Sequence, residues 1–186
     1  INMVKELKER YNIDQATFID ENLMTMDVAS GRSWLKDICD LWIDEGLAPD
    51  RTKKTRSKTG VYWSGTSHAS LHKPDILAKM YESGCTHLVY GLESFDPNIL
   101  KNLGKGSNRK NNISSVSICM ESGIIPVPNI IIGFPDETFE SIRNTITALI
   151  GLGINAKPHF ATAYPGSEWY YKYKNAIIKQ YNGSLE

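Results

Sequence analysis

The segment VPNIIIGFPDET, from Val127 to Thr138, is the stretch of sequence that decides the fold. Its apolar first half, with three consecutive isoleucines, has the composition of a strand that is buried on both faces. Gly133 and Pro135 end this run, and Thr138 can cap a following helix. The apolar residues of that helix recur at helical spacing, at Phe139, Ile142, Ile146, Leu149 and Ile150. The segment therefore predicts a strand, a tight glycine turn and an amphipathic helix.

The turn after this strand is a candidate ligand site. In parallel α/β sheets and barrels, ligands bind where the strands end, in the turns that follow them. A single short motif has low specificity, so a purely structural turn between a strand and a helix remains the alternative. The rest of the chain has to distinguish between the two interpretations.

The same alternation of strand and helix continues along the whole chain. Turn and cap residues divide it into predicted helices at 2–11, 28–45, 74–83, 96–103, 108–122, 139–150 and 168–181. Predicted strands lie at 16–19, 61–63, 87–90, 127–132 and 157–161. Strict alternation with helical crossovers indicates parallel strands, so the predicted fold class is α/β.

The residues just past each predicted strand distinguish a barrel segment from an open doubly wound sheet. They are Asp20-Glu21-Asn22, Ser64 to His68, Glu93-Ser94, Gly133-Phe134-Pro135 and Tyr164-Pro165-Gly166. Polar or glycine-rich groups follow every strand, whereas an open sheet would concentrate them at one switch point. The pattern therefore favours a partial parallel (β/α) barrel of the TIM-barrel type, with one shared rim.

Length, charge and cysteine content narrow the class of protein. The 186 residues suit one domain, and 21 basic residues balance 21 acidic ones, which argues against a nucleic-acid binder that works by bulk charge. No apolar run approaches the roughly 20 residues of a membrane span, and no signal peptide is visible. The cysteines Cys39, Cys85 and Cys119 fit no closely spaced metal motif, so we expect buried, reduced thiols in a cytoplasmic protein.

Five segments in order resemble the radical S-adenosylmethionine (radical SAM) superfamily, in the branch that is often attached to a cobalamin-binding domain and shares a core with methylthiotransferases. They are FIDENL at 18–23, MYESGCTHLVYGLES at 80–94, the turn at 104–108, IIIGFPDET at 130–138 and AYPGSEWY at 163–170. Each segment is weak alone, but five in order, on the expected elements, identify the chain as a member of the family. They extend over nearly the whole chain, so we expect a single barrel domain over residues 1–186.

The resemblance implies a partial (β/α)6 barrel, of which five strands are present in this sequence. It implies an enzyme that binds a [4Fe–4S] cluster through a CxxxCxxC loop after the first strand. In this family the reduced cluster cleaves SAM into methionine and a 5′-deoxyadenosyl radical, which abstracts hydrogen from a substrate. SAM, the cluster and, in this branch, cobalamin are the implied cofactors. The substrate and the reaction outcome are not indicated.

The SAM-contacting positions of the family can be carried over by motif. The acidic turn Asp20-Glu21-Asn22 matches the contact to the methionyl amino group, where a carboxylate can accept charge-assisted hydrogen bonds. Glu93, with Ser94 beside it, matches the contact to the ribose diol. The turn Gly133-Phe134-Pro135 matches the backbone that lies against the adenine, where glycine permits a close approach. No catalytic residue and no metal ligand is assigned.

Structural roles remain open for the same residues. Asp20 or Asn22 can simply cap the turn in which it lies. Glu93 can pair with a neighbouring Lys or Arg, and buried carboxylates perturbed in that way are not always functional. The turn Tyr164-Pro165-Gly166 can close the barrel without contacting a ligand.

The sequence departs from the family in one respect. It contains no CxxxCxxC motif, whose thiolates are the ligands of the cluster. The chain starts where the family has its first helix, so we expect a piece that is truncated before its first strand and at its carboxyl end. Such a piece alone is expected to have no radical chemistry. A different class of function, a non-catalytic barrel remnant that binds a nucleotide or a protein partner, is the alternative.

A barrel without its first strand leaves one strand edge unpaired, at residues 16–19 of this chain. Exposed strand edges recruit partners. We therefore expect self-association through this edge, or its cover by the carboxyl-terminal tail. An ordinary TIM-barrel phosphate enzyme is a weaker alternative, because the turn at 164–167 offers little toward a glycine-rich phosphate loop.

Overall fold

The computed structural model describes residues 1–20, 22–24, 27, 31, 33–52, 59–69 and 73–180. In this part of the chain, one sheet contains five parallel strands in the order β1-β2-β3-β4-β5. The strands are β1 (Gln15–Thr17), β2 (Tyr62–Ser67), β3 (Cys85–Glu93), β4 (Ile125–Ile132) and β5 (Pro158–Phe160). Each strand pairs with the next one along the chain, which confirms the predicted α/β half-barrel.

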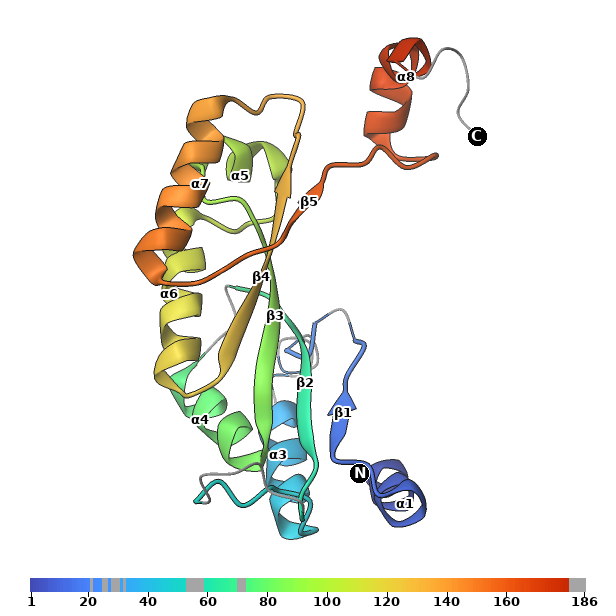
Figure 1. Cartoon of the computed structure of the whole chain (residues 1–186), viewed down its shortest axis with the longest axis vertical. Coiled ribbons are helices and arrows are strands. Elements are labelled where there is room, and N and C mark those ends of the chain that lie inside the picture. Colours follow the sequence, from blue (N-terminus) through green and yellow to red (C-terminus); the bar gives the residue numbers. More distant parts are fainter. Residues whose placement is uncertain are drawn as a thin grey trace.

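The helices that cover the sheet lie on one side of it (Figure 1). All the described helices, whether or not they cover the sheet, are α1 (Asn2–Tyr11), α3 (Trp34–Asp44), α4 (Pro74–Ser83), α5 (Pro97–Leu103), α6 (Arg109–Glu121), α7 (Phe139–Leu152) and α8 (Glu168–Gln180). α3 packs against α4, and α6 contacts α4, α7 and β4. The opposite side of the sheet has no described helix across it in Figure 1, where α1 lies beyond β1 and α8 lies beyond β5. The described sheet is therefore the wall of an incomplete barrel.

Capping residues set the helix ends at several predicted positions. The Asp96 carboxylate accepts hydrogen bonds from two backbone amides at the start of α5, at 2.9 and 3.2 Å. Thr138 and Ser141 form a reciprocal capping box at the start of α7. Gly84 ends α4 with a φ of 114°, a conformation that side-chain-bearing residues rarely adopt. The capping hydrogen bonds at these ends join residues that are close in sequence, which is why the sequence predicts them.

The core lies between the sheet and its helices and contains an aromatic cluster. The ring centroids of Trp42 and Trp63 are 6.3 Å apart, and Phe18 lies 5.5 Å from Trp63. Both indoles are buried, and each N–H has a partner: Trp42 donates to the Val61 carbonyl at 3.2 Å and Trp63 to the Ser83 hydroxyl at 3.1 Å. The cluster joins the end of β1 and α3 to the start of β2.

The prediction that the 127–132 strand is buried on both faces is wrong. Burial alternates along β4: Pro126, Pro128 and Ile130 are buried, whereas Ile125 and Val127 are exposed. The alternation shows that one face of β4 is covered and the other is open. An apolar strand sequence is typical of a closed parallel barrel, and here the described residues form only part of the wall.

The apolar face predicted for the 139–150 helix is confirmed only in part, because Leu149 is half-buried and packs against the core whereas three of its five residues are exposed. Phe139 and Ile150 are 94% and 73% exposed, and Ile146 is exposed as well. The residues of α7 that are buried against the sheet and α6 are small or hydroxylic, namely Ser141, Thr145 and Ala148. Small side chains allow the helix to approach closely, and their hydroxyl groups find partners there.

Three predicted boundaries change in the structure. β2 continues from the predicted end at residue 63 to Ser67 because these residues pair with β3, and β3 continues to Glu93 because its last residues pair with β4. The helix predicted from residue 28 begins at Trp34, and residues 28–30 lie outside the described part of the chain. Asp27 still acts as a cap, since its carboxylate accepts a hydrogen bond from the backbone amide of Leu35 at 2.9 Å.

We predict that Gly84→Ala lowers the free energy of unfolding by about 2 kcal/mol. A Cβ atom at this position would combine a positive φ with contacts of 2.7 Å to Pro49 Cδ and 3.1 Å to the Val61 carbonyl oxygen. Gly46→Ala is the matched control, because φ is 68° there but no atom lies within 4 Å of the added Cβ, so only about 1 kcal/mol is lost. Urea denaturation of both variants measures the difference, and equal losses would contradict the packing argument.

Candidate functional site

The carboxyl ends of β3, β4 and β5 surround a pocket of about 460 Å³. Because all the strands are parallel, the turns that follow them lie along one edge of the sheet. The pocket combines one carboxylate and one ammonium group with aromatic side chains, contributed by Glu93, Lys105, Phe134, Phe160, Tyr164 and Trp169. Its volume lies within the range of small-molecule sites in proteins.

Glu93 adopts an unusual backbone conformation in this pocket. Its φ is 60°, and the amide of Ser94 donates to the carbonyl of Leu92 at 2.7 Å, so residues 92–94 form the positive-φ type of γ-turn. The turn coincides with a register shift, since Gly91 pairs with Asn129 and Glu93 with Ile130, which leaves Leu92 as the extra residue of a bulge. Such a turn is rare for a residue with a side chain and costs of order 1–3 kcal/mol. Strained residues of this kind cluster at ligand sites.

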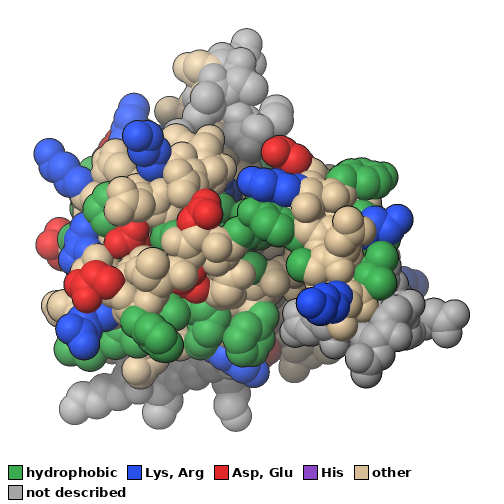
Figure 2. Space-filling view, turned by 90° about the horizontal axis from the view of Figure 1, so that it is seen from above, with side chains coloured by type: hydrophobic (Ala, Val, Ile, Leu, Met, Phe, Trp, Pro, Cys, Tyr) green, Lys and Arg blue, Asp and Glu red, His purple; other side chains and the backbone are tan. Residues whose placement is uncertain are grey.

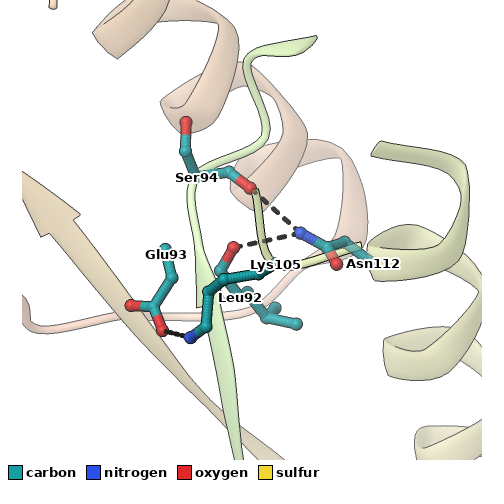
Figure 3. Close-up of polar contacts among 5 residues, drawn as sticks. All are labelled: Leu92, Glu93, Ser94, Lys105 and Asn112. Atoms are coloured by element: carbon teal, nitrogen blue, oxygen red, sulfur yellow. Dashed lines mark hydrogen bonds and ion pairs between the residues drawn. The ribbon is translucent and has the colours of Figure 1, made fainter. Parts of the chain in front are cut away.

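The Glu93 carboxylate forms an ion pair with the Lys105 ammonium (Figure 3). Lys105 comes from the turn between α5 and α6, and the Glu93 side chain is 10% exposed whereas that of Lys105 is 42% exposed. A Cβ atom on Gly91 would lie 2.9 Å from Glu93 Oε1 and 3.3 Å from Lys105 Nζ, so this glycine leaves space for the pair. The alternative that Glu93 pairs with a cation is therefore observed, and the pair lies in the pocket. The turn at 104–108 is part of the family resemblance, but Lys105 within it has no sequence signal of its own.

Ser94 points away from the pocket and into the helix layer. Its hydroxyl lies 3.0 Å from the Thr145 hydroxyl on α7 and accepts a hydrogen bond from the amide of Asp96. Asp96 is bonded in turn by the Asn144 side-chain amide at 2.9 Å. Burial would raise the pKa of Asp96, but hydrogen bonds from Asn144 and from the backbone amides of α5 outweigh it and lower the pKa. This network attaches the end of β3 to α5 and α7.

The turn Gly133-Phe134-Pro135 contributes one aromatic wall. Gly133 has a φ of 88°, and its backbone amide donates to the Glu137 carboxylate. Phe134 is buried and meets Trp169 of α8 edge to face, with ring centroids 5.7 Å apart. Pro135 is exposed and lines a smaller pocket of about 300 Å³ between this turn, α5 and α8. Of the three residues, Phe134 is the one that contacts both pockets.

The acidic turn after β1 lies at a different part of the edge. Asp20 is exposed, Glu21 lies outside the described residues, and the Asn22 side chain accepts a hydrogen bond from the amide of Met24 at 3.1 Å. That bond is the local capping role considered for Asn22. None of the described residues that line the Glu93 pocket comes from this turn. The structure therefore brings Glu93 and Phe134 together and places Asp20 and Asn22 elsewhere, with β2 between.

The three cysteines do not fit the ligands of an iron–sulfur cluster. Cys39, Cys85 and Cys119 are buried in the core as free thiols, as predicted. Burial raises the pKa of Cys39 and of Cys119 to about 11, and it raises that of Cys85 well above its ordinary value. A raised pKa opposes the thiolate form that binds metals. In the described part of the chain, no group of three or more His, Cys, Asp or Glu side chains is placed to hold a metal ion.

The surface seen from above carries no extended charge of one sign over its described residues (Figure 2). Lys and Arg side chains alternate there with Asp and Glu side chains and with hydrophobic ones. This distribution agrees with the balanced charge of the sequence. Among the described helices, none has the length and apolar character that a membrane span needs.

Comparison of the sequence with known proteins shows similarity to one enzyme superfamily. A family model described as the radical SAM superfamily matches residues 4–149. Over 124 residues the chain is 33% identical to an uncharacterized methyltransferase of Pyrococcus horikoshii, a match that covers 66% of this chain and 27% of that protein. It is 31% identical over 125 residues to the bacteriochlorophyllide d C-12(1)-methyltransferase of Chlorobaculum tepidum, covering 65% of this chain and 27% of that protein. The matches thus span about a quarter of the length of these curated relatives.

A solved structure shares the same fold. It is the radical SAM methyltransferase TsrM from Kitasatospora setae, determined with cobalamin and a [4Fe–4S] cluster bound. The TM-score is 0.66 at 14% sequence identity, and the match covers 86% of this chain and 29% of that chain. At this identity the likeness shows the arrangement of strands and helices alone.

We predict that Glu93→Gly leaves the free energy of unfolding unchanged or raises it by up to about 1 kcal/mol. Glycine adopts a positive φ freely, and the lost pair with a partly exposed lysine contributes little stability. Glu93→Ala removes the same pair but keeps the unfavourable φ, so it should be less stable than Glu93→Gly by about 1 kcal/mol. Chemical denaturation measures both. A glycine variant clearly less stable than the wild type would show that Glu93 is retained for the fold.

Proposed function

This chain belongs to the radical SAM superfamily, and on that premise we propose that the carboxyl edge of its sheet binds S-adenosylmethionine for an enzyme that cleaves SAM reductively. The observation that carries the proposal is the Glu93–Lys105 pair in a pocket with aromatic walls. Neither a strained glutamate nor a glycine kept empty beside it improves the stability of the sheet. Both are expected where a carboxylate must meet a ligand.

The chemistry of the pocket matches the parts of SAM. A carboxylate such as Glu93 can accept hydrogen bonds from a ribose diol, and the Lys105 ammonium can donate to the carboxylate of the methionyl group. Phe134 and Trp169 provide flat apolar surface for an adenine next to the Gly133 turn. For the remaining family positions, we propose that Asp20, Glu21 and Asn22 act on the methionyl amino group, and that Ser94 supports the turn from behind.

The cofactors of the full-length protein are a separate part of the proposal. Family membership supports a [4Fe–4S] cluster, and the cobalamin bound in TsrM supports a cobalamin-dependent branch. The buried cysteines of this chain do not fit as cluster ligands, so no step is assigned to either group here. We propose that these 186 residues bind SAM without cleaving it. A CxxxCxxC motif in the adjoining coding sequence is the expected source of the ligands.

The reaction class that has most support is methyl transfer. Both curated relatives described above are named as methyltransferases. The alternative function, a barrel remnant that binds another nucleotide or a protein, is favoured by the unsuitable cysteines alone. It predicts that the pocket does not distinguish SAM from nucleotides without a methionyl group.

We predict that the chain binds SAM, and that Glu93→Gln and Lys105→Met each weaken binding about tenfold or more, because each removes a hydrogen bond to or from a charged group. Equilibrium dialysis with radiolabelled SAM measures the affinities. Lys101→Met is the matched control, because this exposed lysine on α5 lies outside the pocket and its loss should leave the affinity unchanged. Equal binding of ATP and SAM, or variants with unchanged affinity, would favour the non-catalytic alternative.

We also propose that the chain self-associates through β1, the edge strand of the described sheet. Within the described sheet, β1 is paired on one side only, and Ile19 beyond it is 92% exposed. Light scattering over a concentration series should therefore show a mass that rises above the 20.9 kDa of one chain. Ile19→Lys places a charge at the edge and should shift the protein toward monomer. A constant monomer mass at high concentration would contradict this proposal.

A further inference from the structure

A single side-chain amide holds the turn that carries Glu93. Asn112, on the first turn of α6, is fully buried. Its Nδ2 donates to the carbonyl oxygen of Leu92 at 3.1 Å and to that of Ser94 at 3.0 Å, the two residues that flank Glu93 (Figure 3). One nitrogen reaches both oxygens because the γ-turn brings the two carbonyls close together.

The bulge explains why these carbonyls need a partner outside the sheet. Leu92 is the residue without a partner on β4, so its carbonyl is free of the strand ladder. It accepts from the amide of Ser94 within the turn and from Asn112 across it. Without Asn112, the buried Ser94 carbonyl would lose the hydrogen bond from the Asn112 side-chain amide, and burial without a donor is unfavourable. The amide therefore favours the turn over a regular strand end.

An asparagine at position 112 does not give the chain its highest folding stability. Its Oδ1 is among the buried side-chain atoms of the described residues that have no hydrogen-bond partner. The unpaired side-chain carbonyl of Asn112 and the positive φ of Glu93 both oppose folding. The two features are adjacent, because Asn112 bonds the residue that follows Glu93. An apolar residue at 112 with a regular strand end would avoid both.

The same helix start also sets the position of the lysine. Asn108 caps α6 by accepting from the amide of Asn111 at 2.9 Å, and Lys105 lies three residues before this cap. Arg109 adds a hydrogen bond from its guanidinium to the carbonyl of Phe95 at 3.2 Å. The start of α6 thus holds the backbone around Glu93 and leads directly into the turn that supplies its partner.

We propose that Asn112 is a positioning residue, which holds residues 92–94 in the γ-turn so that the Glu93 carboxylate meets Lys105 in the pocket. The ligand of that pocket rests on the proposed function, whereas the effect on the turn does not. Asn112 itself touches no ligand in this proposal. Its role differs from core packing because it acts through the backbone of another residue.

The test compares Asn112→Leu with Asn144→Leu by NMR of the isotopically labelled chain. Both substitutions remove a side-chain amide, and the Asn144 amide bonds Asp96 instead of the turn. In Asn112→Leu, the three-bond coupling between HN and Hα and the Cα shift of residue 93 should change to values of a negative φ, and the Lys105 Nζ resonance should shift as the pair breaks. In Asn144→Leu they should stay as in the wild type. Unchanged signals of Glu93 and Lys105 in a destabilised Asn112→Leu variant would overturn the proposal.

SAM affinity provides a second, separable readout. We expect Asn112→Leu to weaken SAM binding about tenfold, and the double variant with Glu93→Gln to bind no more weakly than Glu93→Gln alone, because both changes disable the same group. Additive losses would overturn the positioning role. If the wild type binds no SAM, the proposed function fails, and the NMR comparison still decides the role of Asn112. If the leucine variant does not fold, Asn112→Ala gives the same measurements.

Discussion

Parallel pairing of β3 with β2 on one side and β4 on the other is the constraint from which the site follows. The register with β4 is regular from His87 to Gly91 and then slips by one residue. Because every described strand runs in the same direction, this slip occurs at the edge where β4 and β5 also end. A carboxylate from the slipped strand therefore meets aromatic groups from the next turn and from α8. The parallel fold brings the strand ends to one edge, and the bulge in β3 places the Glu93 carboxylate there.

Local features of this chain could be predicted from its sequence, and features that depend on distant contacts could not. Asp96 and Thr138 act on amides within a few residues, so their capping roles are visible in the adjacent sequence. The buried face of α7 depends on what the helix packs against. Thr145 is 5% exposed because its hydroxyl bonds Ser94 and the amide of Phe95, whereas the more hydrophobic Ile150 is 73% exposed. Hydrophobic periodicity contains no information about such partners.

The candidate site was predictable to a similar extent. Glu93 and Phe134 were found through motifs that follow predicted strands, and both line the pocket. Lys105 lies in a matched turn, but a lysine between two glycines is ordinarily a solvated residue. Asn112 gives no signal, because an asparagine early in a helix usually faces water, and its two acceptors lie 18 and 20 residues away. A bulge cannot be identified from strand composition alone. The sequence therefore does not show that the carbonyls on either side of Glu93 need a hydrogen-bond donor.

The ion pair and the aromatic wall of the pocket belong to different parts of the chain. Glu93 and Lys105 are separated by only 12 residues, within one continuous stretch from β3 to the start of α6. Closing such a short loop costs little entropy, so the polar half of the pocket can form and persist by itself. The opposite wall requires α8 to rest on the Phe134 turn. An excursion of that last helix would therefore uncover the aromatic side of the cavity, while the ion pair and the sheet stayed in place.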